Sequence, residues 1–175
     1  DEQLDRSIFG WEMPISWVQS INPVFIIVLS GVFAAIWTKL GTKAPPAPAK
    51  FGLGTLVLGA ACRLFLPWAG SGKGGTPLLA MILILFVFTI AELFISPPGL
   101  SVTTNLAPAK FRTQMVALYF LSVSLGTSIA GWLAQYYDPK EEVPYFMILG
   151  AIAVGIGVVL LLAVKPVLAL MRGVR

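Results

Sequence analysis

One acidic side chain lies in the middle of a long apolar stretch of this sequence. Glu92 stands within residues 88–94, which read FTIAELF. An acid at the centre of a membrane-spanning helix costs about 2.5 to 3.5 kcal/mol on insertion scales, so such residues usually have a functional role. We interpret Glu92 as a site for a cation, a substrate amine or a proton, facing a watery cavity. A protonated acid, or one paired with a neighbouring helix for structural reasons, is the alternative.

Two amide side chains form a polar patch in an earlier apolar stretch. Gln19 and Asn22 are three residues apart, which places both on the same face of a helix. Pro23 follows directly, and a proline leaves one helix carbonyl without its usual donor. An amide both donates and accepts hydrogen bonds, so the patch is suited to bind a substrate. A hydrogen bond between helices that holds a bundle together explains the same residues, and both interpretations stay open.

The sequence excludes several kinds of chemistry. It contains no histidine and one cysteine, Cys62, so the usual zinc ligand sets and His-based catalytic arrangements cannot be assembled. Glu92 has no base partner within the apolar stretches, which argues against an enzyme. The net charge of +4 does not indicate nucleic-acid binding, because the basic residues stand mostly at the ends of apolar runs. We therefore predict no catalytic residues, no metal, no cofactor and no nucleic-acid partner.

The elements that position these residues are predicted from composition and run length. Of 175 residues, 57% are hydrophobic and only 11% are charged, whereas a soluble domain carries roughly 25% charged residues. The apolar runs are continuous rather than alternating, so they predict helices that span a lipid bilayer and not barrel strands. We predict an all-α transmembrane protein with five membrane-spanning helices, at about 17–37, 51–68, 77–106, 111–136 and 144–168.

Polar, proline-rich and glycine-rich segments separate these helices. Residues 1–13 are predicted to form an extracellular loop, and residues 41–50, which contain three prolines, a stiff cytoplasmic connector. Within the third helix, Pro97 and Pro98 remove backbone donors and are followed by Gly99. We predict that this helix bends there.

The distribution of basic residues predicts the orientation in the plasma membrane. One side of the predicted bundle carries most of them: Lys39, Lys43, Lys50, Lys110, Arg112, Lys165, Arg172 and Arg175. The other side carries Arg6, Lys73 and Lys140. Because lysine and arginine are enriched in cytoplasmic loops, the N-terminus is predicted outside and the C-terminus in the cytoplasm.

Arg63 is a basic residue near the outer end of the second predicted helix. Arginine can bury its stem while its guanidinium reaches the membrane interface, and we favour this interpretation. A salt bridge to Glu92 is the competing hypothesis, although the two residues differ in expected depth.

Three segments resemble a known family in their order along the chain. Residues 16–25 read SWVQSINPVF, residues 91–101 read AELFISPPGLS, and residues 119–122 read YFLS. They resemble the eighth, tenth and eleventh helices of the proton-dependent oligopeptide transporter (POT) family of the major facilitator superfamily. The resemblance covers essentially the whole chain as helices eight to twelve, which is most of the C-terminal six-helix bundle.

The resemblance implies a function and a set of binding residues. It implies alternating access, with di- and tripeptides bound between two bundles and driven inward by protons. Glu92 would face the peptide amino terminus, and Asn22 would hydrogen-bond the peptide. Tyr119 would shape a side-chain pocket with Val123 near it, and Gln19 is a further pocket candidate. Helices one to seven are required partners on this hypothesis, since one wall of a transport path cannot alternate alone.

Some residues depart from the family pattern. Ala91 replaces a common glycine, Pro98 adds a second proline, and Tyr119 stands where tryptophan is frequent, so pocket size and selectivity stay open. A major facilitator transporter of another substrate, such as nitrate or a drug, is one alternative function. A small membrane scaffold protein without transport activity is another.

Overall fold

The computed structural model describes residues 4–5, 7–8, 11–12, 14–68, 76–138 and 141–171. Within these residues the regular secondary structure is helical apart from four strands of two residues each. The α-helices are α1 (Ile15–Leu40), α2 (Ala47–Leu64), α3 (Leu78–Leu106), α4 (Arg112–Ala134), α5 (Glu142–Leu162) and α6 (Val164–Leu170). The predicted all-α class is confirmed.

Four segments are long and apolar enough to cross a membrane. They are Ser16–Lys43, Leu78–Leu106, Ala109–Ala134 and Glu142–Leu162. Helix α2 has 18 residues but is not among them, because Lys50, Arg63 and several glycines lower its mean hydropathy. The chain is therefore a multi-pass membrane protein with four candidate spans in the part that the structure describes, where the sequence predicted five.

Prolines set several helix boundaries. Helix α2 begins at Ala47, four residues before the predicted start. Pro48 is tolerated in the first turn of this helix, because the backbone N–H that a proline lacks would have no partner within the helix there. The last predicted helix is divided into α5 and α6 after Leu162. Pro166 accounts for this division, since it has no N–H to donate to the carbonyl of Leu162. The predicted connector 41–50 is correspondingly shorter, and its first part, Gly41–Lys43, is a 3₁₀ turn.

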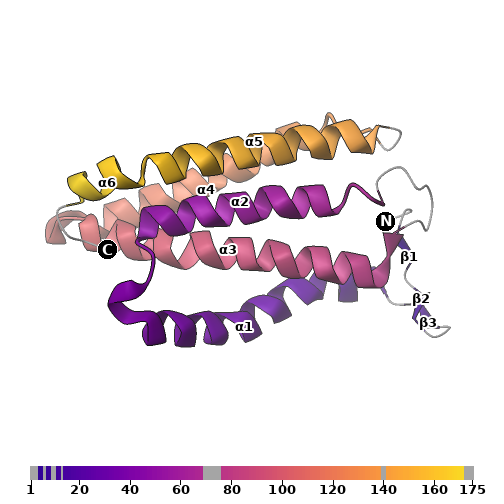
Figure 1. Cartoon of the computed structure of the whole chain (residues 1–175), viewed down its shortest axis with the longest axis horizontal. Coiled ribbons are helices and arrows are strands. Elements are labelled where there is room, and N and C mark those ends of the chain that lie inside the picture. Colours follow the sequence, from indigo (N-terminus) through magenta and orange to yellow (C-terminus); the bar gives the residue numbers. More distant parts are fainter. Residues whose placement is uncertain are drawn as a thin grey trace.

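Helices α1 to α5 lie alongside one another and alternate in direction (Figure 1). Helix α2 packs between α3 and α5, while α1 and α4 each pack against α3. Helix α3, which carries Glu92, is therefore in contact with three other helices. Helix α4 has no buried residue. No other described part of the chain therefore covers the α4 side of the bundle.

Close packing holds α2 against its two neighbours. A Cβ atom added to Gly59 would lie 2.6 Å from Val154 Cγ2 and 3.0 Å from the carbonyl oxygen of Gly150, both on α5. On the other side, a Cβ atom added to Gly54 would lie 3.0 Å from the carbonyl oxygen of Ala91 on α3. Small residues allow such approach, which is the main way that helices associate within a bilayer.

The two ends of the bundle differ in charge. Strand β1 (Leu4–Asp5) pairs in parallel with β4 (Thr76–Pro77), which joins the N-terminal segment to the start of α3. Strand β2 (Ser7–Ile8) pairs antiparallel with β3 (Trp11–Glu12) at the same end (Figure 1). Apart from Arg63 in the last turn of α2, the described basic residues lie at the opposite end: Lys39, Lys43, Lys50, Lys110, Arg112 and Lys165. Arg6, Lys73, Lys140, Arg172 and Arg175 lie outside the described residues.

Candidate functional site

Two of the predicted binding residues line one cavity. An open cavity of about 430 Å³ lies among α1, α2 and α3. Its lining is Asn22, Leu58, Leu85, Phe88, Ala91, Glu92, Ile95 and Ser96. Mostly apolar walls with a few polar groups are typical of binding sites for small molecules, because the walls supply affinity and the polar groups supply orientation.

The spacing of residues on α3 directs Glu92 into this cavity. Leu85, Phe88 and Glu92 follow one another at intervals of three and four residues, which places them on one face of the helix. The adjacent residues Ala91 and Leu93 are buried, whereas Glu92 is exposed. The carboxylate is thus presented to a ligand and not to the packed side of the bundle.

Asn22 is connected to α3 through a residue that the sequence analysis missed. Thr89 is fully buried, and its hydroxyl donates to Oδ1 of Asn22 at 2.6 Å. The same hydroxyl lies 2.8 Å from the carbonyl oxygen of Leu85 in its own helix. Its single hydrogen is shared between two acceptors, one on each helix. This contact joins α1 to α3 one helical turn before Glu92 and restricts the orientation of the Asn22 amide.

Arg63 lies away from this cavity. Its side chain is exposed, and its Cγ lies 3.5 Å from the position that a Cβ atom of Gly150 would take. The stem therefore packs on α5, whereas Glu92 is on α3. Among the residues that the structure describes, Glu92 and Arg63 form no ion pair. The hypothesis of a salt bridge between them is wrong for this structure.

Tyr119 attaches α4 to the proline segment of α3. Its hydroxyl donates to the carbonyl oxygen of Ser96 at 3.2 Å. A Cβ atom added to Gly99 would lie only 2.9 Å from Cε2 of Tyr119, so the ring packs directly on this glycine. Tyr119 does not line the cavity of Glu92, although Ser96 does. It adjoins the site through that one residue.

The other predicted residues are not brought into the cavity. Gln19 is exposed on α1, and Val123 is 47% exposed on α4. Pro97 and Pro98 lie within α3, which continues as one helix from Leu78 to Leu106. The bend at these prolines stays a prediction.

A second polar contact lies at the end of the bundle opposite the basic residues. In the turn after α4, the hydroxyl of Tyr137 donates to Oε1 of Glu142, and Glu142 is 2% exposed. Burial, followed by this hydrogen bond and the charge of Glu142, raises the pKa of Tyr137 to about 12 from the usual value of 10.0. The contact ties the turn to the first residue of α5.

Substituting Tyr137 with phenylalanine should remove one tyrosine that ionises late. The measurement is the phenolate absorbance of the parent and of the variant as the pH is raised. We expect the two curves to differ by one tyrosine with a pKa near 12. A raised pKa favours the folded state fully below pH 10, and this contribution decreases as the pH rises from 10 towards 12. A difference curve centred near pH 10 would contradict the buried contact.

Comparison with known proteins identifies a family for this chain. A model of the POT family matches residues 2–152. A di-/tripeptide transporter of Lactococcus lactis subsp. cremoris is 39% identical over 176 aligned residues, which cover 98% of this chain and 35% of that protein. The uncharacterised transporter YclF of Bacillus subtilis is 36% identical, over 99% of this chain and 36% of its own length.

Solved structures agree with this comparison. A variant of a peptide transporter POT in complex with alafosfalin superposes with a TM-score of 0.89 at 37% identity, over 98% of this chain and 36% of that one. A POT family transporter in complex with 5-aminolevulinic acid gives a TM-score of 0.83 at 32% identity, over 94% and 35%. This chain therefore spans about a third of the length of the proteins that it matches.

Proposed function

Since this chain belongs to the POT family of transporters, we propose that it supplies the last five membrane-spanning helices of a proton-coupled transporter of di- and tripeptides. The observation that carries the proposal is the cavity that Asn22 and Glu92 both line. Relatives described as di-/tripeptide transporters support the choice of substrate. The remaining two thirds of such a transporter would supply the second bundle.

A peptide fits the chemistry of this cavity. The carboxylate of Glu92 can bind the ammonium group of a peptide through a charge-assisted hydrogen bond, which is stronger than one between neutral groups. Asn22 can donate to a peptide carbonyl while its own oxygen accepts from Thr89. The apolar lining from Leu58, Leu85 and Phe88 suits a peptide side chain. A proton on Glu92 would cancel the attraction for the ammonium group, which links release to protonation.

Tyr119, Val123 and Gln19 are proposed to contribute to the pocket only in the complete transporter. Tyr119 already lies beside Ser96, so a second bundle facing α3 and α4 could bring a substrate side chain against its ring. Val123 and Gln19 are exposed on α4 and α1, where further helices have room to pack. The bend at Pro97, Pro98 and Gly99 would let the end of α3 tilt with α4.

Helix α2 is proposed as the fifth span. Its 18 residues correspond to about 27 Å, close to the roughly 30 Å of a hydrocarbon core. It lies between α3 and α5 and runs alongside both (Figure 1). Lys50 stands in its first turn and Arg63 in its last, so both charges can reach the interface.

The basic end of the bundle is proposed to face the cytoplasm of the cell. A Thr42→Cys variant in the 3₁₀ turn and an Asp138→Cys variant at the opposite end, both in a Cys62→Ala background, test this orientation. A maleimide that cannot cross membranes should label the Asp138→Cys protein on intact cells and the Thr42→Cys protein only after permeabilisation. The reverse pattern would reject the proposed orientation.

The transport function is tested by uptake of a labelled dipeptide into proteoliposomes. We expect uptake driven by a proton gradient when this chain is part of the complete transporter, and none when the chain is reconstituted alone. A matched sample without the gradient measures passive entry. A complete transporter that moves nitrate or a drug but no dipeptide would favour the alternative substrate class, and one that inserts but moves nothing would favour a scaffold.

A further inference from the structure

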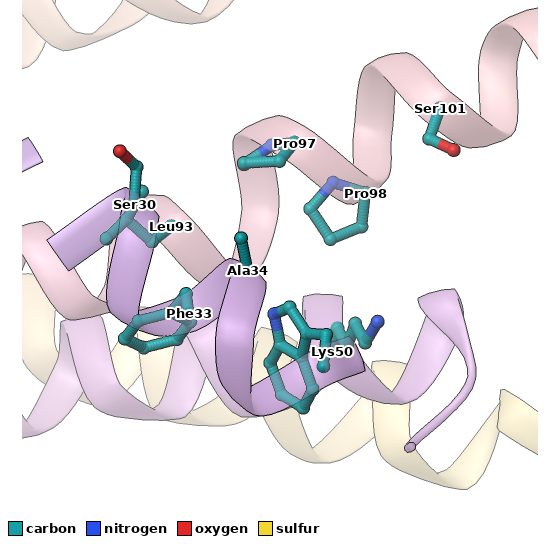
Figure 2. A pocket seen from close by; sticks show the side chains of 9 residues that line it. Ser30, Phe33, Ala34, Lys50, Leu93, Pro97, Pro98 and Ser101 are labelled. Carbon is teal, nitrogen blue, oxygen red and sulfur yellow. The ribbon is translucent and has the colours of Figure 1, made fainter. Parts of the chain in front are cut away.

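A second cavity lies at the basic end of the bundle, apart from the proposed peptide site. It has a volume of about 350 Å³ and opens between α1, α3 and the first turn of α2 (Figure 2). Its lining is Ser30, Phe33, Ala34, Trp37, Lys50, Leu93, Pro97, Pro98 and Ser101. None of these residues lines the cavity of Glu92. The two cavities therefore lie on different faces of α3.

Lys50 places a partly buried positive charge in this second cavity. Its Nζ lies 4.3 Å from the ring centroid of Trp37. The indole ring is held edge-to-face by Phe33 and Phe94, at centroid distances of 5.9 and 5.7 Å. A cation over a tryptophan face is favourable, and it leaves N–H donors of the ammonium group free to bind an anion. Lys50 is thus fixed in position and still able to bind.

The chain supplies no acidic partner to Lys50 in the part that the structure describes. The sequence contains eight acidic residues. Of those described, Glu92 lines the other cavity, and the rest stand on the strands, between α4 and α5, or at the first residue of α5, at the opposite end of the bundle. Other cations, including Lys39 and Lys43, lie at the same end as Lys50. The described residues therefore supply no anion to Lys50, and its ammonium group can bind one from elsewhere.

The lining carries its one charged residue, Lys50, at one end of the cavity. Lys50, Trp37 and Ser101 lie towards the basic end, and Figure 2 shows Ser30 and Leu93 at the other end of the cavity. Trp37 and Ser30 are seven residues apart on α1, about 10 Å. The Oγ of Ser101 accepts a hydrogen bond from Asn105 at 3.2 Å, which leaves its own hydrogen to donate. A charged head at the Lys50 end, with an apolar stem along Phe33, Ala34 and Leu93, would match this arrangement.

We propose that this cavity binds an anionic phospholipid, with its phosphate against Lys50 and Ser101 and the start of an acyl chain along Phe33, Ala34 and Leu93. Basic pockets between membrane helices are suited to anionic headgroups, and the bilayer supplies such lipids at high local concentration. Inorganic phosphate carries a similar negative charge but has no apolar stem. It would therefore leave the part of the cavity along Phe33, Ala34 and Leu93 empty. The proposal does not depend on which substrate the transporter carries.

Retention of phosphatidylglycerol by the complete transporter tests the proposal. The protein is reconstituted in nanodiscs of phosphatidylcholine with phosphatidylglycerol, and the retained lipid is counted by native mass spectrometry. We expect Lys50→Gln to weaken retention of one phosphatidylglycerol about fivefold. Lys43→Gln is the matched control, because it removes a charge from the same end but outside the cavity. Ala34→Phe, which fills the cavity without changing a charge, should cause a loss similar to that of Lys50→Gln.

The outcomes separate the two sources of phosphate. Equal retention by the Lys50→Gln and Lys43→Gln proteins would overturn the proposal, as would retention unaffected by Ala34→Phe. Displacement of the lipid by millimolar inorganic phosphate would assign the site to the soluble anion instead. If the Lys50→Gln protein does not fold, Ala34→Phe still decides whether this cavity holds the lipid.

Discussion

Replacing Glu92 with glutamine should weaken dipeptide binding by the complete transporter about 10- to 100-fold. Glutamine keeps the size and shape of the side chain but removes its charge, so the attraction between the carboxylate and the peptide ammonium is lost and one hydrogen bond from the ammonium remains. Hydrogen bonds to charged groups contribute about 1.5 to 3 kcal/mol, which corresponds to this range in dissociation constant. The measurement is the concentration dependence of labelled dipeptide binding and of its uptake into proteoliposomes.

The design of this experiment separates a role in binding from a loss of folding. Glu141→Gln is the matched control, because Glu141 is an exposed carboxylate at the start of α5, remote from the cavity. Membrane insertion should be the same for both variants. An N-acetylated dipeptide gives a further readout, since the parent should discriminate strongly against it and the Glu92→Gln protein should do so weakly. Unchanged binding of the free dipeptide by Glu92→Gln would reject the assigned role.

A Thr89→Val substitution is expected to weaken dipeptide binding about 5- to 30-fold without touching the ligand. Valine has nearly the same shape, but it cannot donate to Oδ1 of Asn22, which now lies at 2.6 Å from the hydroxyl. The amide then loses its fixed orientation and a partly buried oxygen loses its partner. Such a loss costs about 1 to 2 kcal/mol, which gives the expected change in the dissociation constant.

Thr103→Val is the control for this substitution. The Thr103 hydroxyl lies on the same helix and bonds the carbonyl of Gly99 at 2.8 Å, in the same local geometry that Thr89 has with Leu85. Among the described residues, the Thr103 hydroxyl makes no such bond to another helix. Thr89→Ser should restore binding, and Thr89→Val should have little further effect in an Asn22→Ala background. Additive effects of the two substitutions would show that Thr89 does not act through Asn22.

The sequence predicted the class of structure well because its physical basis is local. Continuous apolar runs and the prolines between them identify helices without knowledge of their neighbours. The errors at α2 and α5 have one cause, the position of proline within a turn. Pro48 is tolerated in the first turn of α2, whereas Pro166 ends α5 four residues earlier.

The candidate site was harder to predict from the sequence than the fold, because it depends on which helix faces pack against one another. Glu92 was recognisable from its cost in an apolar helix, and Asn22 from the proline beside it. Thr89 gave no such signal, since a threonine in a helix is usually satisfied by its own backbone and only packing shows the bond to Asn22. The contact of Tyr119 with Ser96 and Gly99 likewise follows from the docking of α4 on α3.

The packing of α2 has a consequence for biogenesis. This helix is the least suited of the five long helices to enter lipid by itself, yet it is the one in closest contact with both α3 and α5. We therefore expect its stable insertion to require α3 and α5, which are translated after it. Substitutions on the faces of α3 and α5 that contact α2 should consequently lower the amount of folded transporter in the membrane. The protein that does fold should keep its affinity for substrate.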